Sequence, residues 1–352
     1  MHMADALLSP AVGGTMWLIS AGTIAYCSKK VREELDERKV PLMGVLGAFT
    51  FAAQMINFTI PLTGSSGHLG GGLLLTLLLG PHAAFLVIAS VLVVQALFFA
   101  DGGIMALGCN IFNLGFFPAF IAAPFIYRRI VGCDPGRTRM TVAALCAAVA
   151  GLLLGACGVM LETAESGVSA LPIVPFMTLM LPIHLAIGVV EGVVTASIIS
   201  LVATARPELL VHTLPPTPAA GRSLRVAAAA FLAIALLSGG FFSLFASERP
   251  DGLEWSIDRT TGGKELTGVD GGIHGAVAAL QEKLAFLPGY TFRRAAATEE
   301  ESLNRNDKAV QGGGEEVKSP VGTGVAGIVG GVITLAVAFL AGVLIKLKNQ
   351  FE

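Results

Sequence analysis

The chain alternates long apolar runs with short polar connections, which is the pattern of a protein that crosses a membrane repeatedly. A spanning helix needs roughly 20 mostly apolar residues. One run, 69–80, is shorter and follows a glycine-rich stretch, so it forms either a half-helix or a helix completed by the backbone before it, and we count it as a span. Together with it, the longer runs predict nine spans. These longer runs are 11–28, 40–60, 83–100, 104–127, 138–161, 173–204, 224–246 and 322–346.

The positions of Lys and Arg indicate the orientation, because cytoplasmic loops are enriched in both. With an exterior N-terminus, 14 basic residues fall in the interior connections, whereas the short exterior connections 61–67, 100–103 and 162–172 hold none. Omitting the short span would reverse every later loop and destroy this asymmetry. We therefore predict a multi-pass protein of the inner (plasma) membrane with its C-terminus in the cytoplasm. Residues 1–10 lack Lys and Arg, so we expect no cleaved signal peptide.

Composition narrows the class further. Hydrophobic residues make up 54% of the chain and charged residues 14%, with a mean hydropathy of +0.74, whereas soluble domains carry about 25% charged residues. The net charge of −2 and the lack of a basic stripe argue against a nucleic-acid partner. No G-x-x-x-x-G-K-[ST], H-E-x-x-H or G-x-S-x-G motif occurs. The chain is thus expected to be an all-α membrane protein without its own ATP site.

The second part of the chain differs from the first in its distribution of polar and apolar residues. Two spans there flank an exterior loop, 247–321, with 13 acidic and 9 basic residues. Within it, 298–319 is low in apolar residues and is expected to be disordered, and 274–287 can form a short amphipathic helix. A Pro-rich polar stretch precedes this part and is predicted to be a cytoplasmic linker. The predicted units are therefore 1–210, 211–223 and 224–352.

The first candidate for chemistry is the start of the chain, Met1-His2. A free terminal amine, the His2 backbone nitrogen and the His2 imidazole can chelate one metal ion through five- and six-membered rings. A fourth nitrogen would complete a square, the geometry preferred by Ni(II) and Cu(II) and accessible to Co(II). A histidine at the second position can also occur by chance.

The second candidate is the stretch G-S-S-G-H-L-G-G-G at 64–72. Non-helical backbone is tolerated in a membrane only where protein or a cavity covers it, and a Gly-interrupted short helix often marks a transporter's binding site. A re-entrant element here would carry His68 inward from the outer face. The alternative is a flexible exterior loop with a stray histidine.

Polar residues inside the apolar runs form the third set. Asn110 and Asn113 lie in one run, and His184 and Glu191, seven residues apart, project from nearly the same face of another. Asn110 could orient His68, and all four could instead serve helix packing. A zinc enzyme with His68, His184 and Glu191 around the metal is the alternative from another class.

Three further histidines carry a weaker signal. His82 is expected at the inner end of the short span, and His212 in the cytoplasmic linker. His274 lies in the exterior loop, where a solvated surface histidine is the favoured interpretation.

Several of these motifs together resemble a known family. The start M-H-M-A-D-A-L-L-S-P, S-G-H-L-G-G-G at 66–72, N-I-F-N-L-G in the fifth span and H-L-A-I-G-V-V-E-G at 184–192 are similar to the CbiM/NikM family over residues 1–210. These proteins are the substrate-binding membrane subunits of cobalt and nickel energy-coupling-factor transporters. P-D-G-L-E-W at 250–255, with the final span, resembles the PDGLE/CbiN-like accessory component, here fused.

The resemblance implies a seven-helix bundle, to which the C-terminal part adds two spanning helices. It implies that the N-terminal segment inserts into the bundle and that Met1, His2 and His68 hold the metal. It also implies two partner ATPases and a membrane coupling subunit, with transported Co(II) or Ni(II) as ligand and no resident cofactor. Family starts often read M-H-I-P-[ED]-G, whereas this chain reads M-H-M-A-D-A.

Overall fold

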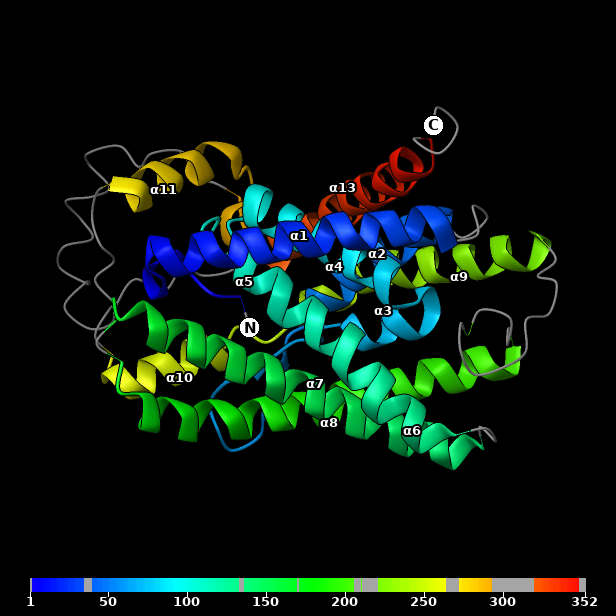
Figure 1. Ribbon diagram of the computed structural model, residues 1–352, viewed down its shortest axis with the longest axis horizontal. Helices are drawn as coiled ribbons and strands as arrows, with labels where there is room; N and C mark the ends of the chain where they lie inside the picture. Colours follow the sequence, from blue (N-terminus) through cyan, green and yellow to red (C-terminus); the bar gives the residue numbers. More distant parts are fainter. Residues whose placement is uncertain are drawn as a thin grey trace.

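The computed structural model describes most of the chain as a bundle of helices that run roughly along its long axis (Figure 1). The residues that the structure describes are 2–34, 40–132, 136–169, 171–205, 210, 221–263, 272–292 and 320–347. Met1, which is one of the predicted metal ligands, His212, most of the predicted linker and the stretch 298–319 lie outside these residues.

Each predicted apolar run contains a helix. The helices are α1 (Pro10–Glu34), α2 (Val40–Gln54), α3 (Gly72–Leu79), α4 (Pro81–Phe99), α5 (Leu107–Ile111) with the π-helical η3 (Phe112–Tyr127) and α6 (Arg128–Val131), α7 (Arg137–Ser166), α8 (Ile173–Ala205), α9 (Gly221–Gly240) and α13 (Pro320–Leu347). Within the described part, six are long and apolar enough to cross a membrane: α4, α5 to α6, α7, α8, α9 with the residues after it, and α13. The chain is a polytopic helical membrane protein.

Of the helices in the predicted apolar runs, the three outside these six, namely α1, α2 and α3, all lie in the first third of the chain. Helix α2 has 15 residues, and the apolar run 40–60 was predicted to stay helical beyond its end at Gln54. Helix α3 has eight residues, about 12 Å of rise. The run 69–80 therefore forms the half-helix, one of the two forms that the sequence left open. Residues 55–71 between α2 and α3 are not helical, and we call them the glycine loop.

Short elements complete the architecture. Two strands of two residues each, β1 (Phe58–Thr59) and β2 (Ser66–Gly67), pair in antiparallel orientation and fold the glycine loop back on itself. The C-terminal part adds η5 (Phe242–Phe245), α10 (Gly252–Thr261), α11 (Gly272–Leu284) and η6 (Pro288–Tyr290), and η1 (Asp5–Leu7) precedes α1. Helix α11 matches the amphipathic helix predicted near 274–287, whereas α10 was not predicted. Both helices lie at the same end of the bundle (Figure 1).

Helix α4 lies at the centre of the bundle. Of its most apolar window, 78% is buried, against 28% for α9 and for α13, which keep most of their surface for lipid. The two C-terminal helices nevertheless pack on the first part of the chain. Phe231 of α9 meets Phe49 of α2 edge to face at 5.4 Å, and Gly44 of α2 lies against the α13 backbone at Leu335. The two predicted units therefore share one packed core.

Helix α1 approaches α5 so closely that backbone meets backbone. A Cβ on Gly108 would lie 2.5 Å from the Trp17 nitrogen. Ser20 donates to the Gly108 carbonyl at 2.6 Å, and the Trp17 indole donates to the Ile104 carbonyl at 2.9 Å. A small residue such as Gly108, which lets two backbones approach closely, promotes helix association in lipid, where no hydrophobic force draws helices together.

We expect Gly108→Ala to destabilise the protein by about 1–3 kcal/mol, the usual effect of overpacking a tight core. The matched control is Gly14→Ala in α1, where an added Cβ meets nothing within 4 Å and helix propensity gains up to about 1 kcal/mol. Thermal unfolding in detergent measures both. Equal midpoints for the two variants would contradict the close approach of α1 and α5.

Candidate metal centre

The N-terminal segment, residues 2–9, is partly buried in the bundle and is held there mainly through its backbone. The Met3 amide donates to Asn110 Oδ1 at 2.8 Å, and the Met3 carbonyl accepts from Asn110 Nδ2 at 3.3 Å and from the Gly103 amide at 2.9 Å. Asp5 accepts from the Ala106 amide at 2.9 Å. Because an unpaired buried backbone group is costly, these contacts fix the segment in one position.

Apolar side chains of the same segment anchor it. Met3 and Leu8 are fully buried, and Leu7 is 1% exposed. From outside, His274 of α11 contacts the Leu8 carbonyl through Nε2 at 2.9 Å. The interpretation of His274 as a solvated surface residue was therefore wrong, because His274 is half-buried and makes this contact with the segment.

The His2 imidazole faces His68. The two rings stack with centroids 5.2 Å apart and planes inclined by 19°. His2 Nε2 lies 3.1 Å from Gln95 Oε1, and His2 Nδ1 lies 3.4 Å from Asp101 Oδ1. The sequence predicted that His2 and His68 come together, and the fold does bring them together from positions 66 residues apart.

The glycine loop carries His68 and is itself held by buried side chains. His68 Nδ1 lies 3.1 Å from the Leu69 carbonyl. Glu191 of α8 accepts from the Gly70 amide at 2.8 Å and from the Gly71 amide at 3.1 Å. Glu191 therefore holds the loop in place. Non-helical backbone inside the bundle needs such partners, as the sequence argument expected.

Two buried glutamines were missed by the sequence analysis. Gln54, 3% exposed, ends α2, and Gln95, fully buried, lies near the end of α4. Gln95 Nε2 donates to Gln54 Oε1 at 2.7 Å, and Gln54 Nε2 donates to the Gly70 carbonyl at 2.9 Å. An amide side chain inside an apolar run is the signal that could have found both glutamines, and it is the same signal that Asn110 and Asn113 carry.

The P-D-G-L-E sequence starts α10 with a capping box directly beside the site. Asp251 accepts from the Leu253 and Glu254 amides at 2.8 Å each, and Glu254 accepts from the Asp251 amide at 3.1 Å. The Pro250 carbonyl accepts from the Ser66 amide of the glycine loop at 2.8 Å.

Gly252 allows α10 to approach α8. A Cβ there would lie 2.5 Å from Ile183 Cγ2 and 3.3 Å from His184 Cε1. The glycine of the P-D-G-L-E sequence is therefore required by this close packing of the C-terminal part on α8.

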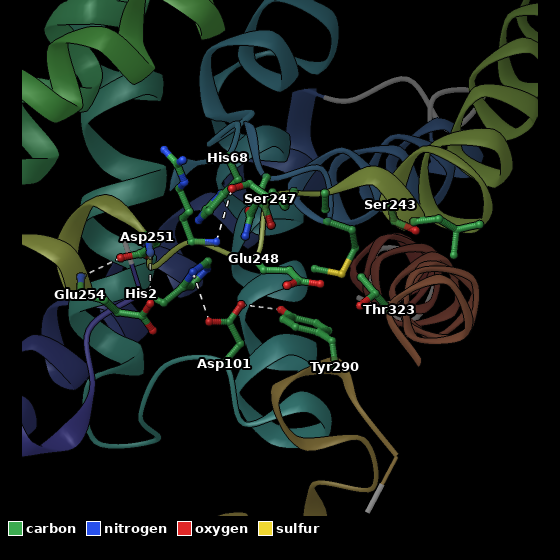
Figure 2. Close-up of a pocket in the computed structure, with 16 residues that line it drawn as sticks. His2, His68, Asp101, Ser243, Ser247, Glu248, Asp251, Glu254, Tyr290 and Thr323 are labelled. Atoms are coloured by element: carbon green, nitrogen blue, oxygen red, sulfur yellow. Dashed lines mark hydrogen bonds and ion pairs between the residues drawn. The ribbon is translucent and has the colours of Figure 1, made fainter. Parts of the chain in front are cut away.

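Tyr290 brings the C-terminal part to the His2 side of the site. Its hydroxyl donates to Asp101 Oδ2, and Figure 2 shows Asp101 between His2 and Tyr290. A cavity of about 100 Å³ opens here. Its lining includes both histidines, Gln54 and four acidic residues, namely Asp101, Glu248, Asp251 and Glu254.

The electrostatics of the site keep its two histidines neutral. Burial is the main cause that lowers the pKa of His68, to about 3, and the neighbouring His2 lowers it further. Burial also lowers the pKa of His2, against the opposing effect of Asp101. Burial alone would raise the pKa of Asp101, but His2 and the Tyr290 hydrogen bond outweigh it, so this pKa is lowered. Neutral imidazoles are the form that binds metals.

The remaining predicted residues have structural partners. Asn110 holds Met3, as described above, where the sequence suggested a contact with His68. Asn113 donates to Glu162 of α7 at 2.7 Å, which links two helices. His184 Nδ1 lies 2.8 Å from the Met180 carbonyl. His82 lies at the start of α4, directly after the short helix α3, and its ring is 3.7 Å from Glu34.

The structure contradicts a zinc site built from His68, His184 and Glu191. Among the described residues, no group of three or more His, Cys, Asp and Glu side chains could hold a metal ion. The two Glu191 oxygens already accept backbone amides. A site built partly from main-chain nitrogens does not need such a group of side chains.

Comparisons with known proteins agree with this picture. Residues 2–209 match the family described as "Cobalt uptake substrate-specific transmembrane region" (CbiM), and residues 225–347 match the PDGLE domain. A putative metal transport protein of Haloquadratum walsbyi is 38% identical over 60% of this chain and 93% of its own.

Two relatives extend the match into the C-terminal part. The fused nickel transport protein NikMN of Rhodobacter capsulatus is 30% identical over 78% of this chain and 81% of its own, and the probable fused nickel transport protein LarMN of Lactiplantibacillus plantarum is 34% identical over 73% and 78%. A solved transition metal transporter, 28% identical, covers 60% of this chain and 96% of its own with a TM-score of 0.51.

We expect Asn110→Leu to release the N-terminal segment, because the buried Met3 amide would lose its acceptor at a cost of about 1–3 kcal/mol. Hydrogen exchange of peptides covering residues 2–9 measures this. The control is Asn113→Leu, which removes a buried hydrogen bond to Glu162 away from the segment. Equal exchange in the two variants would show that Asn110 has no special role.

Proposed function

The chain belongs to the CbiM/NikM family and carries a fused PDGLE domain, and from this premise we propose that it is the substrate-capturing subunit of an energy-coupling-factor transporter for Ni(II) or Co(II). Its relatives are named as cobalt, nickel or metal transport proteins, so its role is in metal transport and not in catalysis. The metal ion is the substrate, and the protein needs no resident cofactor.

The observation that carries the proposal is the burial of the N-terminal segment against the glycine loop. A surface tail would leave residues 2–9 in solvent, yet Met3, Leu7 and Leu8 are buried and Met3 is fixed by three backbone contacts. This position sets the His2 ring against the His68 ring. The extensive burial and hydrogen bonding of these first residues support a functional role for them.

The proposed donors are four nitrogens. Met1 would supply its amine, His2 its amide and its imidazole Nδ1, and His68 its imidazole. The contact of His68 Nδ1 with the Leu69 carbonyl supports Nε2 as the metal-binding nitrogen, because a ligating histidine usually donates its other N–H to a carbonyl or carboxylate. Loss of protons from the amine and the amide makes binding weaker as pH falls.

We propose Ni(II) as the preferred ion. An all-nitrogen square suits Ni(II), and two relatives that match both parts of this chain are named nickel transport proteins. The same donors also accommodate Co(II). A comparison of the protein's affinities for the two ions therefore tests which ion it prefers.

The ion is proposed to enter from the exterior, with the N-terminus outside as the Lys and Arg distribution predicts. The cavity beside His2 supports this route, because its lining carries four carboxylates and, of basic side chains, Arg249. Such a lining favours a cation. The C-terminal part supplies three of those carboxylates, so it forms part of the proposed entrance.

Energy for release is proposed to come from partners. The sequence carries no phosphate-binding loop of the G-x-x-x-x-G-K-[ST] type. The resemblance to the family implies two cytoplasmic ATPases and a membrane coupling subunit, which would drive release of the ion. By analogy with the family, the bundle would tilt as a rigid body in the lipid.

We expect a few residues placed ahead of Met1 to abolish retention of Ni(II) and Co(II), because the terminal amine is then no longer adjacent to His2. The same residues added after Glu352 are the control. Bound metal per purified protein is measured by elemental analysis. Full retention by the N-terminally extended protein would overturn the proposed ligand set.

We expect His68→Ala to weaken Ni(II) binding by more than the roughly 10–100-fold that the loss of a supporting partner costs. His82→Ala is the control, since His82 contacts Tyr26 and Phe120 and no residue of the site. Titration of the metal-free protein with Ni(II) measures both. An unchanged dissociation constant in His68→Ala would place the fourth ligand elsewhere.

A further inference from the structure

An unbroken chain of buried amides joins His2 to the backbone of the glycine loop. It runs from the Gly70 carbonyl to Gln54, from Gln54 to Gln95 and from Gln95 to His2, with separations of 2.9, 2.7 and 3.1 Å. Gln54 is 3% exposed and Gln95 fully buried, so the amides have little access to water as a substitute partner.

The donor-to-acceptor direction of this chain of hydrogen bonds is fixed at its Gly70 end. A backbone carbonyl can only accept, so Gln54 must present its NH₂ group to Gly70 and its oxygen to Gln95. Gln95 must then present its NH₂ group to Gln54 and its oxygen to His2. An amide oxygen also only accepts, and His2 Nε2 must therefore carry the proton.

We propose that Gln95, oriented by Gln54, is a positioning residue that selects the His2 tautomer with the proton on Nε2 and the lone pair on Nδ1. This inference rests on the proposed function, in which Nδ1 binds the metal. It adds a residue outside the ligand set whose task is to aim the imidazole before the ion arrives.

The competing tautomer would place a proton on Nδ1, directed at Asp101. That contact is 3.4 Å long, beyond the usual 2.7–3.2 Å of an N–H···O hydrogen bond. It would also require Gln95 to rotate its NH₂ group toward His2. Two oxygens would then meet at Gln54, and rotation of Gln54 would only move the clash to the Gly70 carbonyl. A buried unpaired group costs about 1–3 kcal/mol wherever it falls.

The same chain links the two histidines. The Gly70 peptide accepts from Gln54 through its own carbonyl, and the Gly70 amide donates to Glu191 of α8. Gly70 is two residues from His68, so the group that sets the tautomer of His2 also holds the loop that carries His68. The alignment of both rings thus depends on one rigid set of contacts.

The test compares Gln95→Met, which removes the acceptor at similar length, with Gln95→Glu, which keeps an acceptor toward His2 and, protonated at this buried position, still donates its O–H to Gln54. Ring-¹⁵N histidine spectra of the full-length metal-free protein report the tautomer, and the His2→Gln variant identifies the His2 signals. Ni(II) titration reports affinity. We expect Nε2–H in the wild type and in Gln95→Glu, a mixture in Gln95→Met, and a Ni(II) affinity roughly 10–100-fold lower in Gln95→Met alone.

Two results would overturn the inference. One is a wild-type spectrum with the proton on Nδ1, which needs no variant and so does not depend on whether Gln95→Met folds. The other is a folded Gln95→Met protein with wild-type tautomer and affinity. Failure of the proposed function looks different, because Ni(II) would then bind equally well to the N-terminally extended protein, whatever the tautomer of His2.

Discussion

The pairing of the Met3 backbone with Asn110 is the contact on which the rest of the site depends. Asn110 uses both ends of its amide, accepting from the Met3 amide and donating to the Met3 carbonyl. A backbone segment inside an apolar bundle has no water to satisfy it. With its polar groups paired at Met3 and at Asp5, the N-terminal segment can pack into the bundle, and His2 is placed against His68 as a consequence.

The glycine loop, which leads into the half-helix α3, is a second non-helical segment whose backbone needs hydrogen-bond partners inside the bundle. Residues 55–71 give up helical hydrogen bonding, and buried side chains from two helices, α2 and α8, replace it. Gln54 pairs with the Gly70 carbonyl, and Glu191 with the Gly70 and Gly71 amides. His68 therefore lies outside any helix, and its ring can face His2. A side chain held on a regular helix at that sequence position would not do so.

The C-terminal part belongs to the site as well as to the bundle. The capping box at Asp251 and Glu254 begins α10 beside the glycine loop, while Gly252 lets α10 rest on His184. Tyr290 reaches Asp101 from the other side (Figure 2). Because the two parts are fused and cannot diffuse apart, the C-terminal part has a fixed effective concentration near the bundle, which maintains these contacts.

The sequence by itself determined the all-helical membrane class, the positions of the helices in the apolar runs and the meeting of His2 with His68, because apolar length and unusual local motifs are encoded residue by residue. Partners distant along the chain were decided by the tertiary structure alone. Asn110 contacts Met3 from 107 positions away and His274 contacts Leu8 from 266, and Gln95 reaches His2 across 93. Such pairs leave no periodic signal, because burial inside the bundle, and not spacing along the chain, dictates which polar group must satisfy which.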